Sequence, residues 1–372
     1  MRSIAEKLEY LRTRDGEPLK LMEVCGTHTA GIFRSGIRGV LSPTIRLISG
    51  PGCPVCVTPA AYIDRCAMYA RMPAHTLACF GDMLKVPGSA RSLSEVRAEG
   101  GRVEMIYSPF EVLDWAMSAP ERTFVIAAVG FETTVPAYGL LMDELIGRGI
   151  ENVKLLTALK SAIPAIERIC QTEESVDGFL CPGHVSVITG SKVYEPLAER
   201  YGKPFVVAGF EAEHLVHAIY ELTRSAETVK ADSTGGTNTP GQSAEAPKKR
   251  GSVRNLYGEA VSAEGNPKAR RVMERYFKPG AAVWRGLGEM DASGLYLRGE
   301  YRRFDAGSRG LDEDGCLPDG CLCADVITGR IDPDACPMFG GACVPGNAQG
   351  PCMVSSEGAC GIWYQNASGT FG

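Results

Sequence analysis

The chain has 372 residues, of which 44% are hydrophobic, and it carries a formal net charge of −5 with a pI near 5.7. This length supports a large buried core divided among two or three domains. The sequence has no dense Lys/Arg stripe, which argues against a nucleic-acid partner because phosphate neutralisation needs a basic face. No segment has the ~20 uninterrupted apolar residues of a membrane span, and the charged start lacks the apolar region of a secretory signal. We therefore expect a cytoplasmic protein with no membrane partner.

The first part of the chain has the pattern of α/β domains. Residues 1–17 have the apolar spacing of an amphipathic helix, and short apolar runs then alternate with helical patterns as far as residue 222. Apolar strands that alternate with helices are typical of parallel sheets covered on both faces. We predict two Rossmann-like α/β domains, at 18–135 and 136–223. The predicted strands are 19–24, 44–49, 76–80, 103–107, 123–129, 152–159, 178–181 and 204–209.

Two of the intervening segments, 58–72 and 109–119, have apolar residues at helical spacing. Thr58 and Pro59 are suitable N-cap and first-turn residues for the first of these helices.

The second part of the chain changes in character. Residues 224–251 are polar and small, and this composition predicts a flexible linker or surface insertion. From residue 252 a helical segment, 265–277, gives way to sequence rich in Gly, Pro and Cys, which needs a covalent or metal staple to hold a shape. We predict that 252–372, together with the helix at 1–17, forms a small third domain.

Polar and thiol side chains follow five of the predicted strands, each next to a glycine. In open α/β sheets, ligands bind beyond the carboxyl ends of the strands. We therefore predict that these strand ends form a cleft that contains the catalytic groups. The groups at the five ends are Cys25, Thr27 and His28; Cys53 and Cys56; Glu132, Thr133 and Thr134; His184; and Glu211 and His214.

Each candidate also has a structural interpretation. Cys53 and Cys56 precede a helix N-terminus, which favours a thiolate for redox exchange or metal binding, but they also fit a buried inert pair. Cys25 fits a core cysteine equally well. His28 and His184 either orient a thiol or hydrogen-bond a carbonyl. Glu132 is either a proton carrier or a solvated loop carboxylate.

The chain has 14 cysteines, and seven of them fall in its last 57 residues. Clustered cysteines in a reducing compartment usually bind metal or perform thiol chemistry. Four of them are spaced among glycines and prolines, without the short Cys-x2-Cys knuckles of structural zinc sites, and this favours a [4Fe–4S] cluster over zinc or a disulfide staple. These four are Cys336, Cys343, Cys352 and Cys360. Spacing alone assigns no role to Cys316, Cys321 and Cys323.

Seven motifs, taken together and in this order, resemble the HypD family of [NiFe]-hydrogenase maturation factors over nearly the whole chain. The main departures are the insertion at 224–251 and Cys181, which stands where the family usually has an apolar residue. The motifs are MEVCGTHT, GPGCPVCVTP, GFETT, PGHVS, EGNPKA, WRGLG and GPCMVSSEGAC.

The resemblance implies a scaffold on which the Fe(CN)2CO unit of the hydrogenase is built as a transient cargo. It implies a HypC-type chaperone as partner, and a HypE-type donor of cyanide made from carbamoyl phosphate that a HypF-type protein activates. Cys25 would bind the iron together with a cysteine of the chaperone, and His28 would shape that pocket. Cys53 and Cys56 would be the redox-active dithiol.

The same resemblance implies that Cys336, Cys343, Cys352 and Cys360 hold a [4Fe–4S] cluster. We expect the cluster domain to fold back so that electrons reach the dithiol. The protein would then act as a redox-active assembly scaffold and not as a conventional turnover enzyme. Two alternatives are a thiol–disulfide oxidoreductase that relays electrons to protein substrates, and a zinc-stabilised interaction module.

Overall fold

The computed structural model describes residues 2–234, 251–313 and 317–366, and the chain divides into two compact units. Unit 1 consists of Met1–Gly52 and Ile166–Asn266, and unit 2 of Cys53–Ala165 and Pro267–Gly372. Both are α/β, with mainly parallel sheets, and the cysteine-rich segment lies at the C-terminal end of the chain, so the predicted fold class is confirmed. The boundary predicted at 135/136 falls at the start of α7 (Val135–Gly147), inside unit 2.

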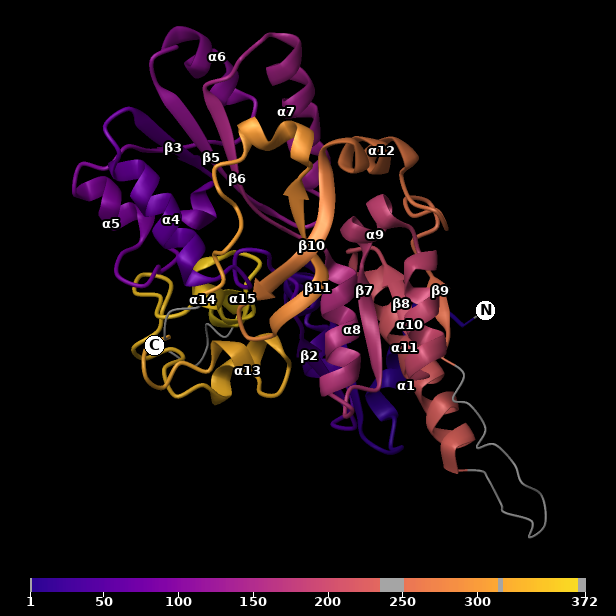
Figure 1. Cartoon of the computed structure of the whole chain (residues 1–372). Helices are drawn as coiled ribbons and strands as arrows, with labels where there is room; N and C mark the ends of the chain where they lie inside the picture. The colour runs from indigo at the N-terminus through magenta and orange to yellow at the C-terminus, as the bar shows by residue number, and fades with distance from the viewer. Residues whose placement is uncertain (1, 235–250, 314–316, 367–372) are drawn as a thin grey trace, which may run out of the picture. The chain divides into compact units, whose positions relative to one another are not determined.

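Unit 1 contains a five-stranded parallel sheet in the order β2-β1-β7-β8-β9 (Figure 1). In β1, Glu23 is in register with Ser49 of β2 and with Leu180 of β7. The carboxyl ends of these neighbouring strands therefore lie at one edge of the sheet. The strands are β1 (Leu19–Glu23), β2 (Ile45–Ser49), β7 (Gly178–Pro182), β8 (Phe205–Ala208) and β9 (Val253–Asn255).

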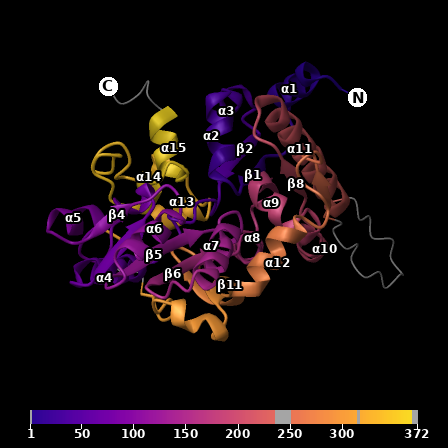
Figure 2. The same cartoon turned by 90° about the horizontal axis from the view of Figure 1, so that it is seen from above.

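The helices of unit 1 cover this sheet. The N-terminal helix α1 lies along α11 (Figure 2), with Leu11 buried in the core and Ser3 and Glu6 forming a capping box. Helix α1 thus belongs to the core of unit 1, whereas the sequence grouped it with the cysteine-rich domain. The helices are α1 (Ile4–Thr13), α2 (Gly26–Arg34), α3 (Ile37–Val40), α9 (Gly183–Thr189), α10 (Glu195–Tyr201) and α11 (Ala212–Thr234), and α8 (Ala162–Thr172) spans the unit boundary.

The linker predicted at 224–251 is wrong for its first part, because α11 continues to Thr234. Ala226 is buried in the core, and the carboxylate of Glu227 accepts hydrogen bonds from Tyr10 and Arg14. Lys230 forms an ion pair with Asp177. These contacts order a polar segment whose composition alone predicts a flexible chain. Residues 235–250 lie outside the described residues.

Unit 2 contains a six-stranded sheet in the order β10-β11-β6-β5-β3-β4. Strands β6, β5, β3 and β4 are parallel, and all residues of β5 except the first are buried, as expected for a strand covered on both faces. All eight predicted strands are present in the two sheets, with ends within two residues of the prediction. The strands of unit 2 are β3 (His75–Cys79), β4 (Val103–Met105), β5 (Thr123–Gly130), β6 (Val153–Lys160), β10 (Phe277–Trp284) and β11 (Gly288–Leu297).

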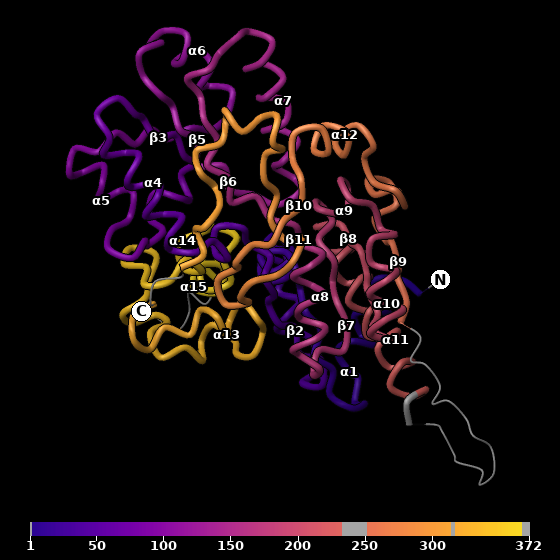
Figure 3. Tube along the Cα trace, viewed as in Figure 1, coloured from indigo at the N-terminus to yellow at the C-terminus, as the bar shows by residue number. Residues whose placement is uncertain are grey.

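The sequence did not predict the antiparallel hairpin β10–β11, whose course is traced in Figure 3. Pro279, Gly280 and several charged residues interrupt its apolar pattern, and the register shifts between Gly280 and Ala282. The hairpin adds to the sheet through β11, which pairs antiparallel with β6. Its apolar residues Phe277 and Leu295 join the core of unit 2.

The predicted helices at 58–72, 109–119 and 265–277 are present as α4, α6 and α12. The predicted cap of α4 is wrong, because Pro59 is the N-cap and the helix begins at Ala60. The Thr58 hydroxyl instead donates to the Pro54 carbonyl, 2.8 Å away, and so braces the preceding loop. The helices of unit 2 are α4 (Ala60–Arg71), α5 (Leu93–Ala98), α6 (Glu111–Ser118), α7, α12 (Pro267–Tyr276), α13 (Cys323–Ile327), α14 (Pro351–Val354) and α15 (Ala359–Asn366).

Among the residues that the structure describes, no helix has both the length and the apolar character needed to cross a membrane.

Candidate functional site

Cys25 lies where β1 passes into α2. It is the N-cap residue of this helix, is 9% exposed and forms no disulfide. The positive end of the helix dipole and the N–H groups of the first turn favour a thiolate at this position. Cys25 therefore has the surroundings of a nucleophile or a metal ligand.

The chain after β2 passes directly against Cys25. A Cβ atom on Gly52 would lie 2.7 Å from both the Cα and the N atom of Cys25, closer than any side chain tolerates. The approach of the two backbones therefore requires glycine at this position. This contact holds the end of the β2 loop against the thiol-bearing turn.

His28 is fully buried in the first turns of α2. Its Nε2 lies 3.2 Å from the carbonyl oxygen of Ala208, and because a carbonyl only accepts, Nε2 carries the proton. Nδ1 is buried and has no hydrogen-bond partner among the described residues. Burial lowers the pKa of His28 to about 4, so the ring is neutral at pH 7.

An aromatic stack connects His28 to the surface. The ring centroid of Phe210 lies 4.8 Å from that of His28 and 4.1 Å from that of His184, a stacked ring that is partly exposed. Partial burial lowers the pKa of His184, so this ring also favours its neutral form. Tyr257 meets Phe210 edge-on at 6.2 Å and lies 6.1 Å from His214. Phe210 and Tyr257 were not among the predicted residues, although Phe210 directly follows a predicted strand end.

Cys53 and Cys56 form a disulfide in a buried loop of unit 2, with Cα atoms 5.3 Å apart. The backbone N–H of Cys56 also points to the sulfur of Cys53, at 3.1 Å. A backbone donor at this distance would stabilise a thiolate on Cys53 when the disulfide is reduced.

The disulfide lies against the cysteine-rich segment within the same unit. The sulfur of Cys56 is 3.7 Å from the carbonyl oxygen of Pro351, the residue before Cys352. The hairpin turn also contacts both parts, because Arg285 N–H donates to the Val57 carbonyl and Gly286 packs on Ala324. The loop that carries Cys53 and Cys56 is therefore in direct contact with the segment that contains the C-terminal cysteines.

Six cysteines of the C-terminal segment are close to one another. The sulfurs of Cys323 and Cys352 are 3.0 Å apart, and Cys352 also interacts with Cys360. Cys321 lies within electrostatic range of Cys336, Cys343 and Cys323. The six are Cys321, Cys323, Cys336, Cys343, Cys352 and Cys360, whereas Cys316 lies outside the described residues.

Buried cysteine thiols such as these are of the kind that ligate iron–sulfur clusters. Burial raises the pKa of Cys321 to about 12 and also raises that of Cys343. Forming these thiolates therefore costs free energy, which a bound metal would offset. The N–H of Gln349 points to the sulfur of Cys343 at 3.3 Å, as is common for cluster ligands. Within the described ranges, no three His, Cys, Asp or Glu side chains surround a position for one metal ion. A [4Fe–4S] cluster does not need such a position, because each of its irons takes its own thiolate.

Glu132, at the end of β5, is buried and contacts a helix start. Its Oε1 accepts from the Ser161 hydroxyl at 2.6 Å and from the backbone N–H of Ala162 at 2.9 Å, where α8 begins. Burial raises the pKa of Glu132, although these bonds partly oppose it. The carboxylate therefore caps α8, and the solvated alternative does not hold.

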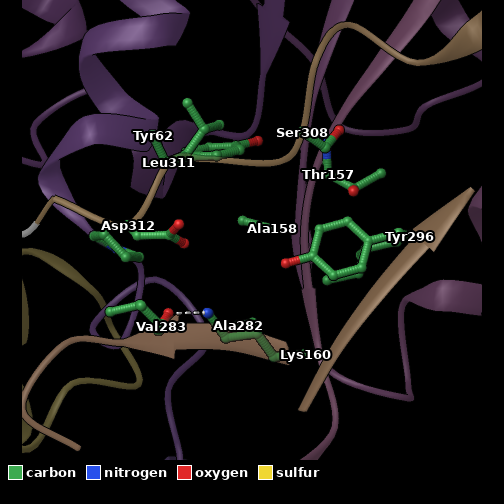
Figure 4. Close-up of a pocket in the computed structure, with 12 residues that line it drawn as sticks. Tyr62, Thr157, Ala158, Lys160, Ala282, Val283, Tyr296, Ser308, Leu311 and Asp312 are labelled. Atoms are coloured by element: carbon green, nitrogen blue, oxygen red, sulfur yellow. Dashed lines mark hydrogen bonds between the residues drawn. The ribbon is translucent and has the colours of Figure 1, made fainter. Parts of the chain in front are cut away.

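A small cavity in unit 2 lies between β6, the start of α4 and the β10–β11 hairpin (Figure 4). Its volume of about 30 Å³ has room for only one or two waters. The lysine in its wall, Lys160, donates to the Val283 carbonyl at 2.7 Å and lies 5.2 Å from the Trp284 ring. This hollow is therefore part of the packing and too small for a substrate.

The predicted site residues thus fall into two groups. Cys25, His28 and His184 lie in unit 1, at the carboxyl ends of β1 and β7. Cys53, Cys56, Glu132 and the C-terminal cysteines lie in unit 2. Four of the five strand ends of the predicted cleft, those of β1, β2, β7 and β8, belong to the sheet of unit 1, and only the end of β5 belongs to the sheet of unit 2.

Comparison with known proteins gives consistent results along the chain. The family model described as "HypD: Hydrogenase formation hypA family" matches residues 1–235 and 243–367. The chain is 39% identical to the hydrogenase maturation factor HypD of Azotobacter vinelandii, over 93% of this chain and 88% of that protein. It is 36% identical to the proteins of that name from Escherichia coli (98% and 93% covered) and Rhodobacter capsulatus (97% and 93% covered).

Proposed function

The chain belongs to the HypD family of hydrogenase maturation factors, and from this premise we propose that it is the scaffold on which the Fe(CN)2CO unit of [NiFe]-hydrogenase is assembled. Membership of this family assigns the chain to hydrogenase maturation in general. The residues that would carry the assembly are the thiol of Cys25, the Cys53–Cys56 pair and the C-terminal cysteines.

In this proposal Cys25 binds the iron of the incoming cargo, together with a thiolate from a HypC-type chaperone. Its position at the start of α2 supports the role, since the helix dipole stabilises a thiolate there. Cyanide and CO require low-spin Fe(II), and a soft thiolate suits such an iron. A HypE-type protein would deliver the cyanide.

The histidines shape the surroundings of Cys25. The Nε2–H of His28 is held by the Ala208 carbonyl, which leaves the lone pair of Nδ1 as an acceptor. A neutral imidazole adds no positive charge next to the iron. Phe210 holds the ring in place through the stack with His184.

The Cys53–Cys56 pair acts as a reversible dithiol. Its reduction takes two electrons and two protons and breaks one S–S bond to give two thiols. The N–H of Cys56, directed at the sulfur of Cys53, supports Cys53 as the sulfur that holds the thiolate. The 3.7 Å contact of Cys56 with Pro351 is the observation that carries the redox part of the proposal, because it joins the dithiol to the cysteine-rich segment.

The C-terminal cysteines would hold a [4Fe–4S] cluster, which supplies or accepts single electrons. Of the four ligands assigned from the sequence, Cys336, Cys343 and Cys360 keep that role in this proposal. The sulfurs of Cys323 and Cys352 lie 3.0 Å apart, and this contact pairs the two thiols with each other. We therefore favour Cys321 over Cys352 as the fourth ligand.

Anaerobic purification with iron and sulfide counts tests this part. We expect four irons and four sulfides per chain, loss of both in Cys336→Ser and Cys321→Ser, and retention in Cys352→Ser. Cys66→Ser, which changes a buried thiol of α4, is the control. Loss in Cys352→Ser with retention in Cys321→Ser would restore the assignment made from spacing. A colourless protein that contains zinc and no iron would contradict the assignment of an iron–sulfur cluster.

A further inference from the structure

A groove of about 530 Å³ lies in unit 2, beside the loop that bears the dithiol. It is formed at the carboxyl ends of β3, β4 and β5, the edge of a parallel sheet where ligands commonly bind. No residue of the site proposed above lines it. The lining consists of Pro54, Val55, Phe80, Gly81, Asp82, Met83, Met105, Ile106, Tyr107, Val129, Thr134, Ser355 and Glu357.

The rim of this groove exposes large apolar side chains. Tyr107 is 80% exposed and Met105 is 37% exposed, although both line the same hollow as buried Met83 and Ile106. Tyrosine is enriched among the residues that dominate binding energy at protein interfaces. Methionine is flexible and polarizable, so it adapts to different apolar partners. Exposed side chains of these two types around one hollow are typical of an interaction surface.

The charged side chains in the lining are both acidic. The carboxylate of Asp82 accepts from the Ser355 hydroxyl at 3.1 Å, and the backbone N–H of Glu357 donates to the same hydroxyl at 3.2 Å. Burial and the negative charge of Asp82 raise the pKa of Glu357, which reports a local excess of negative charge. None of the described residues in the lining is basic. A cationic group would relieve this repulsion.

One wall of the groove is the dithiol loop itself. Pro54 and Val55 are the two residues between Cys53 and Cys56, and both line the groove. Anything bound there touches the loop that carries the disulfide. The groove is therefore placed to let a bound protein sense or favour one state of the dithiol.

We propose that this groove is the docking site for a segment of a partner protein that presents an apolar side chain next to an arginine or lysine. The inference rests on the proposed function, in which partner proteins bring the ligands of the iron to this scaffold. The apolar side chain would enter between Met105 and Tyr107, and the basic side chain would pair with Asp82 and Glu357. Charge complementarity and the exposed Tyr107 distinguish this occupant from an acidic segment or a free anion.

The test uses the full-length protein and pools of six-residue peptides, acetylated and amidated, that contain leucine and a fixed Arg, Lys or Glu. We expect the Arg and Lys pools to bind about tenfold more tightly than the Glu pool, the worth of one well-placed charged hydrogen bond. The double variant Asp82→Lys/Glu357→Lys should reverse this order. Tyr107→Ala should weaken binding of the basic pools by about fivefold or more.

Two matched controls lie on α6, none of whose residues lines the groove. Asp114→Lys reverses an exposed carboxylate, and Met117→Ala removes an apolar side chain that is 50% exposed. Both should bind the pools as the wild type does. The docking proposal would be contradicted if all pools bound equally or if no pool bound. It would also be contradicted if the double variant kept the wild-type order of affinities. If the protein self-associated and Tyr107→Ala abolished this, the occupant of the groove would be a second copy of the chain, and the proposed partner would be wrong.

The outcome is separable from that of the function proposed above. The Tyr107→Ala protein should keep the iron and sulfide content of the wild type, because the tyrosine contacts none of the proposed ligands. Loss of peptide preference with that content intact reports on the groove alone. Failure of the iron and sulfide counts in the wild type reports on the cluster alone.

Discussion

The fold keeps the imidazole of His28 neutral, and this has a consequence for stability. Burial lowers its pKa to about 4, whereas the unfolded chain binds the proton near pH 6.5. Below pH 6.5 the unfolded state therefore binds more protons than the folded state, and stability falls as the pH falls towards 4. The loss attributable to His28 amounts to at most about 3 kcal/mol.

Substituting His28 tests this prediction. In His28→Gln the glutamine amide can still donate to the Ala208 carbonyl but takes up no proton. We expect the free energy of unfolding of this variant to fall less steeply between pH 7 and pH 4.5 than that of the wild type, as measured by urea denaturation. Parallel curves for the two proteins would show that His28 is not held neutral.

Gly52 is the residue that allows the β2 loop to reach Cys25. Because a methyl group at Gly52 meets backbone atoms, no side-chain rotation relieves the overlap. We expect Gly52→Ala to reduce the free energy of unfolding by about 3 kcal/mol. Gly39→Ala in α3 is the control, since nothing lies within 4 Å of the added methyl group and alanine favours the helix. Equal stability of the two variants would contradict the close approach.

At the scale of elements, Glu132 connects the end of β5 to the start of α8. Glu132→Ala leaves the Ser161 hydroxyl and the Ala162 N–H without their acceptor, and we expect a loss of about 2 kcal/mol in unfolding free energy. Glu132→Gln keeps a carbonyl oxygen and should lose less. Hydrogenase activity restored in a HypD-deficient strain completes the test. If Glu132→Gln were as stable as the wild type but inactive in maturation, Glu132 would be a proton carrier instead.

The strands of both sheets could be predicted because they are short, strongly apolar and bounded by helical patterns. The β10–β11 hairpin was missed because Pro279 and its glycines resemble loop sequence, and pairing with β6 decides its structure. The end of α11 was missed for a related reason. Its ordering depends on Tyr10 and Arg14, more than 200 residues away in sequence, which no local pattern reveals.

At the scale of the whole molecule, the order of the motifs was enough to identify the family. It was not enough to predict which motifs lie close together in the fold. Strands β1, β7 and β8 are neighbours in one sheet, so His28, His184 and Phe210 meet there. Spacing could not reveal this, since it depends on strand order. Likewise, the spacing of the C-terminal cysteines did not indicate that Cys323 and Cys352 approach each other or that Cys321 lies among the other thiols.

The central claim is that Cys25 holds the iron cargo while the unit is assembled, and infrared spectroscopy tests it most directly. The protein would be purified without oxygen together with a HypC-type chaperone, from cells that make the other maturation proteins. We expect cyanide and CO stretching bands in the wild type and in Cys170→Ala, which changes a buried thiol of α8 in the same unit. Cys25→Ala should show neither band and should lose the cargo iron. Bands of wild-type intensity in Cys25→Ala, or their absence from the wild-type complex, would contradict the account.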